Sequence, residues 1–395
     1  MNYLIRKIIR RWPGYIMNAI TKPDPFVTEG FHARTCVGKI CKDAGYQNVL
    51  LVTDTTLYGL QYHTAVLESL QEAGVGYTIF SDIQTEPTLS VVERGIAIAR
   101  KSKVDCIIAL GGGSVLDSSK VIAAGAHFLF RSAASLLHYF HFTKTLPIIT
   151  IPSTAGTGAE TTIAAMVQNK KGAKCPTVFT HLNITNVILD SELTVKMPTN
   201  ITAACGIDAL SHGLEGLVSA IHYSAADRDK SLECVRLVLQ NLPIVLEHPD
   251  NVEARQAMCH AAFYGGNAIN KQLAGYVHAF AHSIGAKYHI PHGNAIAISL
   301  LPVMQFQKNA CLKPLAMTAD YCGLANENEP PEVAADKLLN AIGELIANCD
   351  ISTRIEIPES DKKSLIRMIE ADSISYTPPV VMRKEEIQQR LRFEI

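Results

Sequence analysis

The sequence predicts an α/β domain in the amino-terminal half of the chain and an all-helical domain in the carboxyl-terminal half. Up to about Pro198, short apolar runs alternate with helical stretches, which is typical of a parallel sheet covered on both faces. From Thr199 to Asp350 the pattern is long, rich in Ala and Leu, and helical. The length of 395 residues also lies where one hydrophobic core gives way to two. We therefore expect an extension over residues 1–18, an α/β domain over 19–197 and a helical domain over 198–395.

The apolar runs mark the expected strands, and the stretches between them mark the expected helices. The strands are Asn48–Asp54, Tyr77–Phe80, Asp105–Leu110, Leu146–Ile151 and Val187–Asp190. The helices of this half include Thr64–Ala73, Leu89–Ser102 and Ser118–Ala126. In the helical half we expect breaks at prolines, because proline lacks the amide donor that a helix interior needs. These prolines are Pro243, Pro249, Pro291 and Pro330–Pro331.

Composition and charge exclude several classes of protein. Hydrophobic residues make up 48% of the chain and charged residues 18%, which is too apolar for intrinsic disorder. The net charge of -1 gives no electrostatic footprint for a dedicated nucleic-acid binder. The longest apolar stretches, such as residues 294–304, are shorter than the roughly 18 residues of a membrane span. We therefore expect a soluble globular protein with no nucleic-acid or membrane partner.

Two further features of the sequence indicate in which cellular compartment the protein lies. The ten cysteines are scattered without a Cys-x-x-Cys pair, which indicates reduced thiols in a cytoplasmic protein. Residues 1–18 carry four basic residues, but Arg10–Pro13 interrupts the apolar core that a signal peptide needs. We expect a flexible extension here, or a start codon placed ahead of Met17, with a peripheral anchoring helix as the alternative.

Two loops at the ends of expected strands favour a phosphate-bearing ligand. The run Gly111–Asp117 joins a strand to a helix, and its glycines let the backbone approach an anion at the helix amino terminus. Alone this signal is weak, because the third glycine of the usual dinucleotide fingerprint is absent. The loop Pro152–Glu160 is rich in hydroxyls and small residues. Both loops follow neighbouring strands, so we expect them to face one crevice at the carboxyl edge of the sheet.

Asp54 ends the first strand at the same edge. A carboxylate in this position can accept both hydroxyls of a bound ribose, and it repels a 2′-phosphate. The alternative is that Asp54 only caps a helix or a turn.

A group of histidines with one carboxylate indicates a metal site. Asp208 and His212 are four residues apart in a helical stretch, so they share one helix face. His278 and His282 repeat this spacing, and His292 follows in a turn. One carboxylate with imidazoles suits a divalent first-row metal. A single histidine on an apolar helix is usually a core residue, but four histidines within 15 residues, at 278, 282, 289 and 292, make that explanation strained. His222, His248 and His260 are taken as ordinary residues.

Together these residues resemble the iron-containing (group III) alcohol dehydrogenase family from about Phe26 to Ala347. Five motifs carry the resemblance in the order found in the family. They are Gly111–Asp117, Pro152–Glu160, Asp190–Thr194, Gly206–Glu215, and Gly275–His282 with Pro291–Gly293. The family has the dehydroquinate-synthase-like fold, in which a nucleotide-binding α/β domain precedes an all-α metal-binding domain. The resemblance implies that the site lies in the cleft between these domains.

Carried over residue by residue, the resemblance implies a divalent metal, iron or zinc, held by Asp208, His212, His278 and His292. It implies that His282 lies beside the substrate and the nicotinamide without being a ligand. The residues that it implies for NAD are Asp54, Thr88, Gly112, Gly113, Ser114, Asp117, Thr154, Thr157, Lys174 and Leu193. Glu86 stands where many members have Asn, which puts its own contact in doubt. Lys170–Lys171 would suit an anionic cofactor, or would simply be solvated.

The resemblance implies a metal-dependent oxidoreductase that transfers hydride between a primary alcohol, or its aldehyde, and NAD. The metal would act as a Lewis acid on the alcohol oxygen, and the proton would leave through His282, the ribose hydroxyls or water. Family members suggest a homodimer or a larger homo-oligomer.

Three alternatives remain at this stage. Ser375–Arg383 departs from the Asn-Pro-Arg segment of many members and resembles a small branch that oxidises the C8 hydroxyl of 3-deoxy-manno-octulosonate. In that reading Tyr376 would bond sugar hydroxyls. A lyase of the dehydroquinate-synthase type would return its hydride within one turnover, but it uses a Glu ligand and many phosphate-binding Lys and Arg residues. A metal or nucleotide sensor is the third alternative, although no appended binding module is visible.

Overall fold

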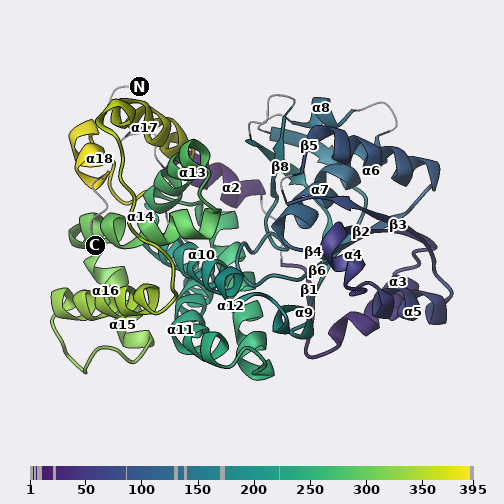
Figure 1. Ribbon diagram of the computed structural model, residues 1–395, viewed down its shortest axis with the longest axis horizontal. Coiled ribbons are helices and arrows are strands. Elements are labelled where there is room, and N and C mark those ends of the chain that lie inside the picture. The colour runs from purple at the N-terminus through teal and green to yellow at the C-terminus, as the bar shows by residue number, and fades with distance from the viewer. Residues whose placement is uncertain are drawn as a thin grey trace. The chain divides into compact units, whose positions relative to one another are not determined.

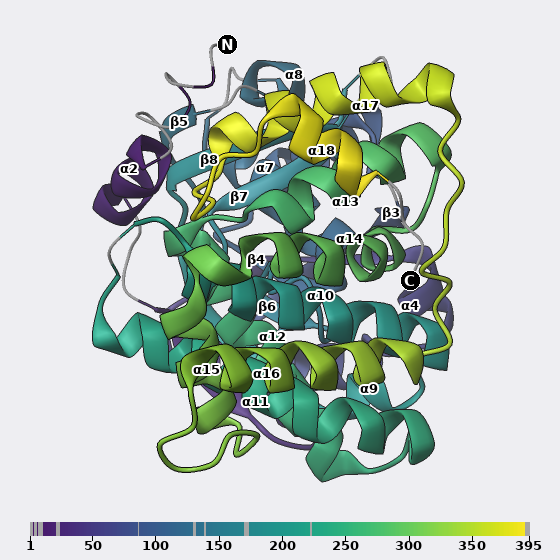
Figure 2. The same cartoon turned by 90° about the vertical axis from the view of Figure 1, so that its left-hand side faces the viewer.

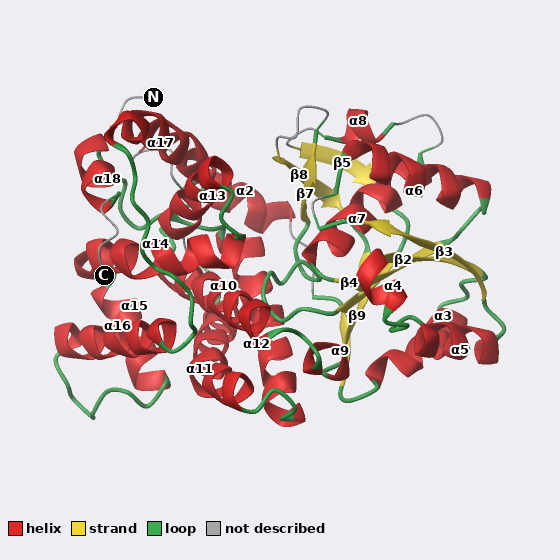
Figure 3. Ribbon diagram, viewed as in Figure 1, coloured by secondary structure: helices red, strands yellow, loops and turns green. Residues whose placement is uncertain are grey.

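The computed structural model describes residues 3, 6, 11–20, 24–85, 87–128, 132–137, 140–169, 174–221 and 223–391. The chain divides into two compact units. The sheet unit is Ile20–Lys196, and the helical unit joins Met1–Ala19 to Met197–Ile395. Figure 3 shows the described strands gathered in the sheet unit. The expected α/β domain followed by a helical domain is confirmed, while residues 1–18, expected as a separate extension, group with the helical unit.

The sheet unit is built on six parallel strands. Their order across the sheet is β1-β9-β6-β4-β2-β3. The strands are β1 (Phe26–Glu29), β2 (Asn48–Asp54), β3 (Gly76–Ile83), β4 (Cys106–Gly111), β6 (Ile148–Pro152) and β9 (Ile184–Leu189). Every residue of β4 and β6 is buried, as expected for central strands covered on both faces. The continuous apolar runs of the sequence are therefore these central strands.

Helices cover this sheet (Figure 1). They are α3 (Val37–Asp43), α4 (Thr55–Gly59), α5 (Thr64–Ala73), α6 (Leu89–Lys101), α7 (Gly113–His127), α8 (Ala133–Leu136) and α9 (Glu192–Val195), with the 3-10 turn η1 (Ala33–Cys36). Val37 of α3 and Leu70 of α5 pack on a buried cluster with Leu51 of β2 and Ile108 of β4. Helices α6 and α7 contact each other, and α7 also contacts β4.

A second, three-stranded sheet was not predicted. It has the order β5-β8-β7, with β5 (Phe140–Lys144), β7 (Ala164–Gln168) and β8 (Lys174–His181). Strands β5 and β8 are parallel, and β7 and β8 are antiparallel. The alternating burial of β7 shows a strand with only one face in the core. Such short strands lack the continuous apolar runs by which β2, β4 and β6 are recognised.

The helical unit contains the helices expected in the second half of the chain, together with one helix that precedes the sheet unit in sequence (Figure 2). They are α2 (Trp12–Ile20), α10 (Thr199–Val218), α11 (Ala225–Glu247), α12 (Val252–Gln272), α13 (Tyr276–Tyr288), α14 (His292–Gln307), α15 (Leu312–Tyr321), α16 (Pro331–Ala347), α17 (Glu359–Asp372) and α18 (Lys384–Arg390), with the 3-10 turns η2 (Lys308–Ala310) and η3 (Ser373–Ser375). Helices α10, α11 and α12 pack together, and α13 packs against α14 and α17. None of the described helices is long and apolar enough to cross a membrane.

The expected breaks at prolines are confirmed in part. Pro291 and Pro330 are the amino-terminal cap residues of α14 and α16. Pro243, however, lies inside α11, so the break expected there is wrong. A proline costs a helix one backbone hydrogen bond, and the packing of α11 against α10 and α12 outweighs this loss.

The amino-terminal residues that the structure describes are docked on the helical unit. Arg6 is 5% exposed, and Gly14 is buried where α2 meets Ile221 and Thr377. A Cβ at Gly14 would lie 2.5 Å from Ile221 Cδ1, so the close approach of α2 depends on glycine. For these described residues the arrangement differs from the flexible extension that the sequence led us to expect.

Candidate active site

The predicted anion loop lies at the amino terminus of α7. Gly112 is the cap residue, and it offers no side chain to the first amide groups of the helix. The amides of Val115 and Leu116 bond the carbonyl of Gly112, which leaves the earlier N–H groups for a ligand. These amides and the positive end of the helix dipole favour a phosphate at this point.

The second loop lies against the first, as the sequence predicts. Strands β4 and β6 are direct neighbours in the sheet, and their carboxyl ends carry the two loops. A Cβ added to Gly112 would lie 3.3 Å from Thr154 Cγ2, and one added to Gly113 would lie 3.2 Å from Thr157 Cγ2. Only a residue without a side chain fits these contacts easily. The two loops therefore form one narrow cradle, lined by backbone and threonine side chains.

Asp54 ends β2, the other neighbour of β4 in the sheet, and is half-buried. Its Oδ1 accepts a hydrogen bond of 2.8 Å from the amide of Leu57 and so caps α4. Both interpretations of Asp54 are thus compatible with the structure: one carboxylate oxygen caps the helix, and the other can accept a ribose hydroxyl.

Asp117 is engaged inside the sheet unit. Its Oδ1 lies 3.0 Å from Nζ of Lys120, and its Oδ2 accepts a 2.9 Å hydrogen bond from the amide of Met166. Lys120 is fully buried and also donates to the carbonyl of Ala164. This geometry suits a residue that shapes the loop more than one that touches an anion, because a carboxylate repels phosphate.

The remaining expected cofactor residues lie in different settings. Ser114 donates its hydroxyl to the carbonyl of Thr85. Thr88 precedes α6 at the cap position without a side-chain cap hydrogen bond, and Leu193 is buried in α9. Lys174 begins β8, but its side chain lies outside the described residues, as do Glu86, Lys170–Lys171 and His222.

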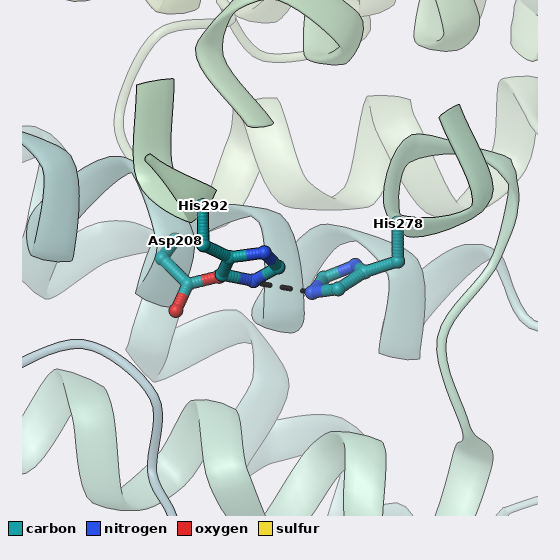
Figure 4. Close-up of side chains that lie close together, drawn as sticks. All are labelled: Asp208, His278 and His292. Carbon is teal, nitrogen blue, oxygen red and sulfur yellow. Dashed lines mark ion pairs between the residues drawn. The ribbon is translucent and has the colours of Figure 1, made fainter. Parts of the chain in front are cut away.

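The four predicted ligands converge within the helical unit. Asp208 and His212 come from α10, His278 comes from α13, and His292 begins α14. Figure 4 shows Asp208, His278 and His292 with their side chains close together. Oδ1 of Asp208 lies 3.4, 3.7 and 3.3 Å from Nε2 of His212, His278 and His292, respectively. Nε2 of His212 and Nε2 of His278 lie 3.0 Å apart.

These separations fit a metal ion. Four tetrahedral ligand atoms at about 2.1 Å from one cation lie about 3.4 Å from each other. The buried Oδ1 of Asp208 has no hydrogen-bond donor among the described residues. A buried carboxylate oxygen without a donor is costly, and a cation at this point would satisfy it.

The charges around the cluster support the same interpretation. Burial lowers the pKa of His212 to about 4. Burial also disfavours the charged form of His278, but Glu215 and Asp208 outweigh it and raise the pKa of His278 to about 10. For Asp208, the imidazoles of His212 and His292 outweigh burial and hold the carboxyl pKa well below its ordinary value. An ionised carboxylate that faces buried imidazoles is an electrostatic setting that a divalent cation stabilises when it binds.

Glu215 supports the cluster from behind. Its Oε2 accepts from Nδ1 of His278, and its Oε1 accepts a 2.8 Å hydrogen bond from the amide of Val277. A carboxylate on the far nitrogen fixes the tautomer of a ligating histidine. Sequence reasoning included Glu215 in a motif but gave it no role. The available signal was its spacing, because Glu215 lies seven residues after Asp208 on the same helix face.

His282 stands beside the cluster and has its own partners. Its ring centroid lies 5.2 Å from that of His292 and 5.7 Å from that of His278. Nδ1 of His282 lies 2.9 Å from Oδ2 of Asp372 and 3.1 Å from the hydroxyl of Tyr376. Sequence reasoning assigned no role to Asp372, and it considered Tyr376 as a sugar-binding residue only in the sugar-acid alternative.

Two family models together match most of the chain. The model described as "Iron-containing alcohol dehydrogenase" matches residues 25–191. The model described as "Fe-containing alcohol dehydrogenase family, C-terminal" matches residues 202–394.

Individual relatives match over nearly the whole chain. The 1,3-propanediol dehydrogenase of Citrobacter freundii is 30% identical over 374 residues, which cover 92% of this chain and 95% of the relative. The NAD-dependent methanol dehydrogenase of Bacillus methanolicus is 27% identical over 365 residues, which cover 90% of this chain and 94% of the relative.

Solved structures agree in fold. A 1,3-propanediol oxidoreductase superimposes with a TM-score of 0.87 at 28% identity, covering 93% of this chain and 97% of its own. A sulfoacetaldehyde reductase from Bifidobacterium kashiwanohense, in complex with NAD+, superimposes with a TM-score of 0.86 at 26% identity, covering 94% of this chain and 97% of its own.

Proposed function

This chain belongs to the iron-containing alcohol dehydrogenase family, and from this membership and its own geometry we propose which residues carry the reaction. The protein is a metal-dependent oxidoreductase that transfers hydride between a primary alcohol, or its aldehyde, and NAD. The relatives described above do not favour the dehydroquinate-synthase-like or sensor alternatives.

We propose that Asp208, His212, His278 and His292 hold the divalent metal, iron or zinc. The observation that carries this proposal is the 3.3–3.7 Å spacing between Oδ1 of Asp208 and the three imidazole nitrogens. A metal bound there supplies Lewis-acid chemistry, because it lowers the pKa of the substrate hydroxyl. The ionised Asp208 offsets part of the positive charge, and Glu215 holds His278 in the tautomer that presents Nε2.

We propose that His282 moves the proton of the alcohol without binding the metal. Its Nδ1 is engaged by Asp372, so Nε2 is the nitrogen that accepts a proton. Its ring lies beside those of His278 and His292, next to the proposed ligand atoms. A general base in such a position contributes about 100-fold or more to turnover.

We propose that NAD binds along the carboxyl edge of the sheet. The amides at the start of α7 and the cradle of Gly112, Gly113, Thr154 and Thr157 hold the pyrophosphate, and Asp54 accepts the ribose hydroxyls. Thr88, Ser114, Lys174 and Leu193 line the rest of the cofactor, and Asp117 keeps the loop in shape. The NAD+ complex of a relative supports the choice of cofactor.

For the substrate we propose a short-chain primary alcohol or diol. The two relatives described above are named for methanol and 1,3-propanediol. The sugar-acid alternative rests on the resemblance of Ser375–Arg383, where Tyr376 would bond sugar hydroxyls; in the structure that hydroxyl contacts Asp372 and His282. Turnover on propanol, 1,3-propanediol and 3-deoxy-manno-octulosonate distinguishes these substrates.

We also propose that the protein is cytoplasmic and forms a homodimer or a larger homo-oligomer. Light scattering measures the oligomeric state.

Metal content and turnover, measured on the same preparations, test the two roles at the metal site. Asp208→Ala is expected to lose the metal and the activity together. His282→Ala is expected to keep the metal and lose about 100-fold in turnover. His248→Ala is the control, because His248 is exposed in the loop after α11. Loss of metal in His282→Ala would show that the ligand and the proton carrier are wrongly assigned.

A further inference from the structure

The imidazole of His282 is held at the junction of two helices. His282 lies in α13, Asp372 is the last residue of α17, and Tyr376 follows η3. Oδ2 of Asp372 lies 2.9 Å from Nδ1 of His282, and it also accepts a 3.3 Å hydrogen bond from the hydroxyl of Tyr376. The same hydroxyl lies 3.1 Å from Nδ1 of His282. One carboxylate and one phenol therefore meet at a single nitrogen.

This contact restricts the imidazole in two ways. A carboxylate facing Nδ1 requires the proton on that nitrogen, so Nε2 stays an acceptor. Rotation of the ring about χ2, which is otherwise broad, would break both contacts. Without them, the ring of His282 samples both tautomers and more than one orientation.

Arg6 fixes the junction from outside. Its guanidinium donates to the hydroxyl of Tyr276, the first residue of α13, and to Oγ of Ser373, the residue after Asp372, both at 2.8 Å. It also pairs with Glu370 of α17 at 2.8 Å. Arg6 is 5% exposed, and a guanidinium with three partners in this setting is held in one geometry. The arginine therefore joins the start of α13 to the end of α17, the two helices that carry His282 and Asp372.

The segment around Arg6 makes further contacts with the same region. Gly14 of α2 packs on Thr377, which follows Tyr376 in the chain. The guanidinium of Arg383 lies 5.2 Å from the ring centroid of Tyr3. Tyr3, Arg6 and Gly14 precede residue 25, where the family match begins. The amino-terminal segment thus adds its own support to the carboxyl-terminal loop.

We propose that Asp372 and Tyr376 are positioning residues that orient His282, and that Arg6 holds the helix junction on which this orientation depends. The proposal rests on the role of His282 proposed above. It assigns a function to the amino-terminal segment, which precedes the family match at residue 25, and to the Tyr376 loop.

A double-mutant cycle tests Asp372. Asp372→Ala is expected to lower kcat by about 10-fold or more, with the KM for alcohol, the KM for NAD and the metal content within about twofold of the wild type. Asp372→Asn is expected to recover most of kcat, because its amide oxygen still accepts from Nδ1. In a His282→Ala background, Asp372→Ala is expected to have no further effect. Independent losses that multiply in the double variant would overturn the proposal.

A spectroscopic readout separates this inference from the proposed role of His282. In zinc-loaded protein labelled with 15N-histidine, the His282 nitrogens are expected to report one Nδ1–H tautomer. Asp372→Ala is expected to change that signal to an averaged one. If His282→Ala leaves kcat unchanged, the proton role fails, while the nitrogen shifts still decide the orientation. An unchanged tautomer in Asp372→Ala overturns the inference.

The proposed role of Arg6 is tested by a substitution with a matched control. Arg6→Met keeps much of the side-chain bulk without the donors, and it is expected to lower kcat several-fold while KM and metal content stay constant. Arg11→Met changes an exposed arginine of the same segment and is expected to leave kcat unaltered. If Arg6→Met does not fold, Ser373→Ala removes one acceptor of Arg6 and is expected to give a smaller loss in kcat. A wild-type kcat in Arg6→Met, or in Ser373→Ala where Arg6→Met does not fold, overturns the role of Arg6.

Discussion

Oε2 of Glu215 lies 2.5 Å from Nδ1 of His278, and both residues are buried beside the proposed metal ligands. The carboxylate also accepts the amide of Val277, so Glu215 is fixed on the start of α13. A histidine held in this way presents Nε2 to a cation with no cost for choosing a tautomer.

Replacing Glu215 by Gln is therefore expected to weaken metal binding by about 10- to 100-fold. Glutamine keeps the shape of the side chain but removes the charge that favours Nδ1–H. Competition with a chelator, followed by metal analysis, gives the affinity. Glu247→Gln, at the exposed end of α11, serves as the control. Equal metal affinity in Glu215→Gln and the wild type would show that Glu215 serves only the fold.

Replacing Asp54 by Ser is expected to relax the preference for NAD over NADP. Serine still caps α4, as the Asp54 contact to Leu57 requires, while the charge that repels a 2′-phosphate is removed. We expect the ratio of kcat/KM for NADP to that for NAD to rise about tenfold, equivalent to about 1.4 kcal/mol. Steady-state kinetics with both cofactors measures it. An unchanged ratio would leave Asp54 as a helix cap alone.

Replacing Gly113 by Ala is expected to weaken NADH binding about tenfold. The new Cβ would stand 3.2 Å from Thr157 Cγ2 and 3.3 Å from its Oγ1, so the threonine must move within the cradle. The loss corresponds to about one charge-assisted hydrogen bond to the pyrophosphate. Fluorescence titration with NADH measures the effect. Gly59→Ala is the control, since its Cβ would meet nothing within 4 Å. Equal affinity in Gly113→Ala and Gly59→Ala would contradict the proposed cradle.

The buried Glu160 makes stability depend on pH. Burial raises the pKa of its carboxyl from 4.5 to about 7, and its Oε1 has no partner among the described residues. Between these two values the folded chain keeps a proton that the unfolded chain has lost, so this contribution to stability falls as pH rises from about 4.5 to 7. Glu160→Gln is expected to remove the dependence and to be more stable than the wild type at pH 8, by on the order of 3 kcal/mol.

Urea unfolding at several pH values between about 4.5 and 8 checks this expectation. Glu68→Gln changes an exposed carboxylate of α5 and should leave the pH dependence as it is. If Glu160→Gln and the wild type lose stability in parallel over this range, the carboxyl of Glu160 is ionised in the folded state.

The sequence predicts the central sheet well because its strands are buried on both faces. Asn48–Asp54 and Thr64–Ala73 have the same bounds in the structure as β2 and α5. Strand β1 escapes prediction, since three of its four residues are exposed and no apolar run marks it. The break predicted at Pro243 fails for a different reason, because tertiary packing of α11 overrides a local preference.

Some residues of the candidate site could be related from the sequence, and others could not. Asp208 and His212 could be paired from their spacing on one helix, and so could His278 and His282. That His292 joins them depends on how α14 packs against α10, which spacing alone does not give. Asp372 and Tyr376 lie 90 and 94 residues from His282, in a segment with no metal-ligand or nucleotide motif. Only the packing of α17 against α13 brings them to the imidazole.

The helical unit is discontinuous, because Met1–Ala19 belongs to it together with Met197–Ile395. Arg6 forms hydrogen bonds with Glu370 and Ser373, which lie 364 and 367 residues away in the sequence. During synthesis on the ribosome, the sheet unit is made before residues 197–395 exist. Residues 1–19 therefore have no helical unit to pack against until residues 197–395 have been made.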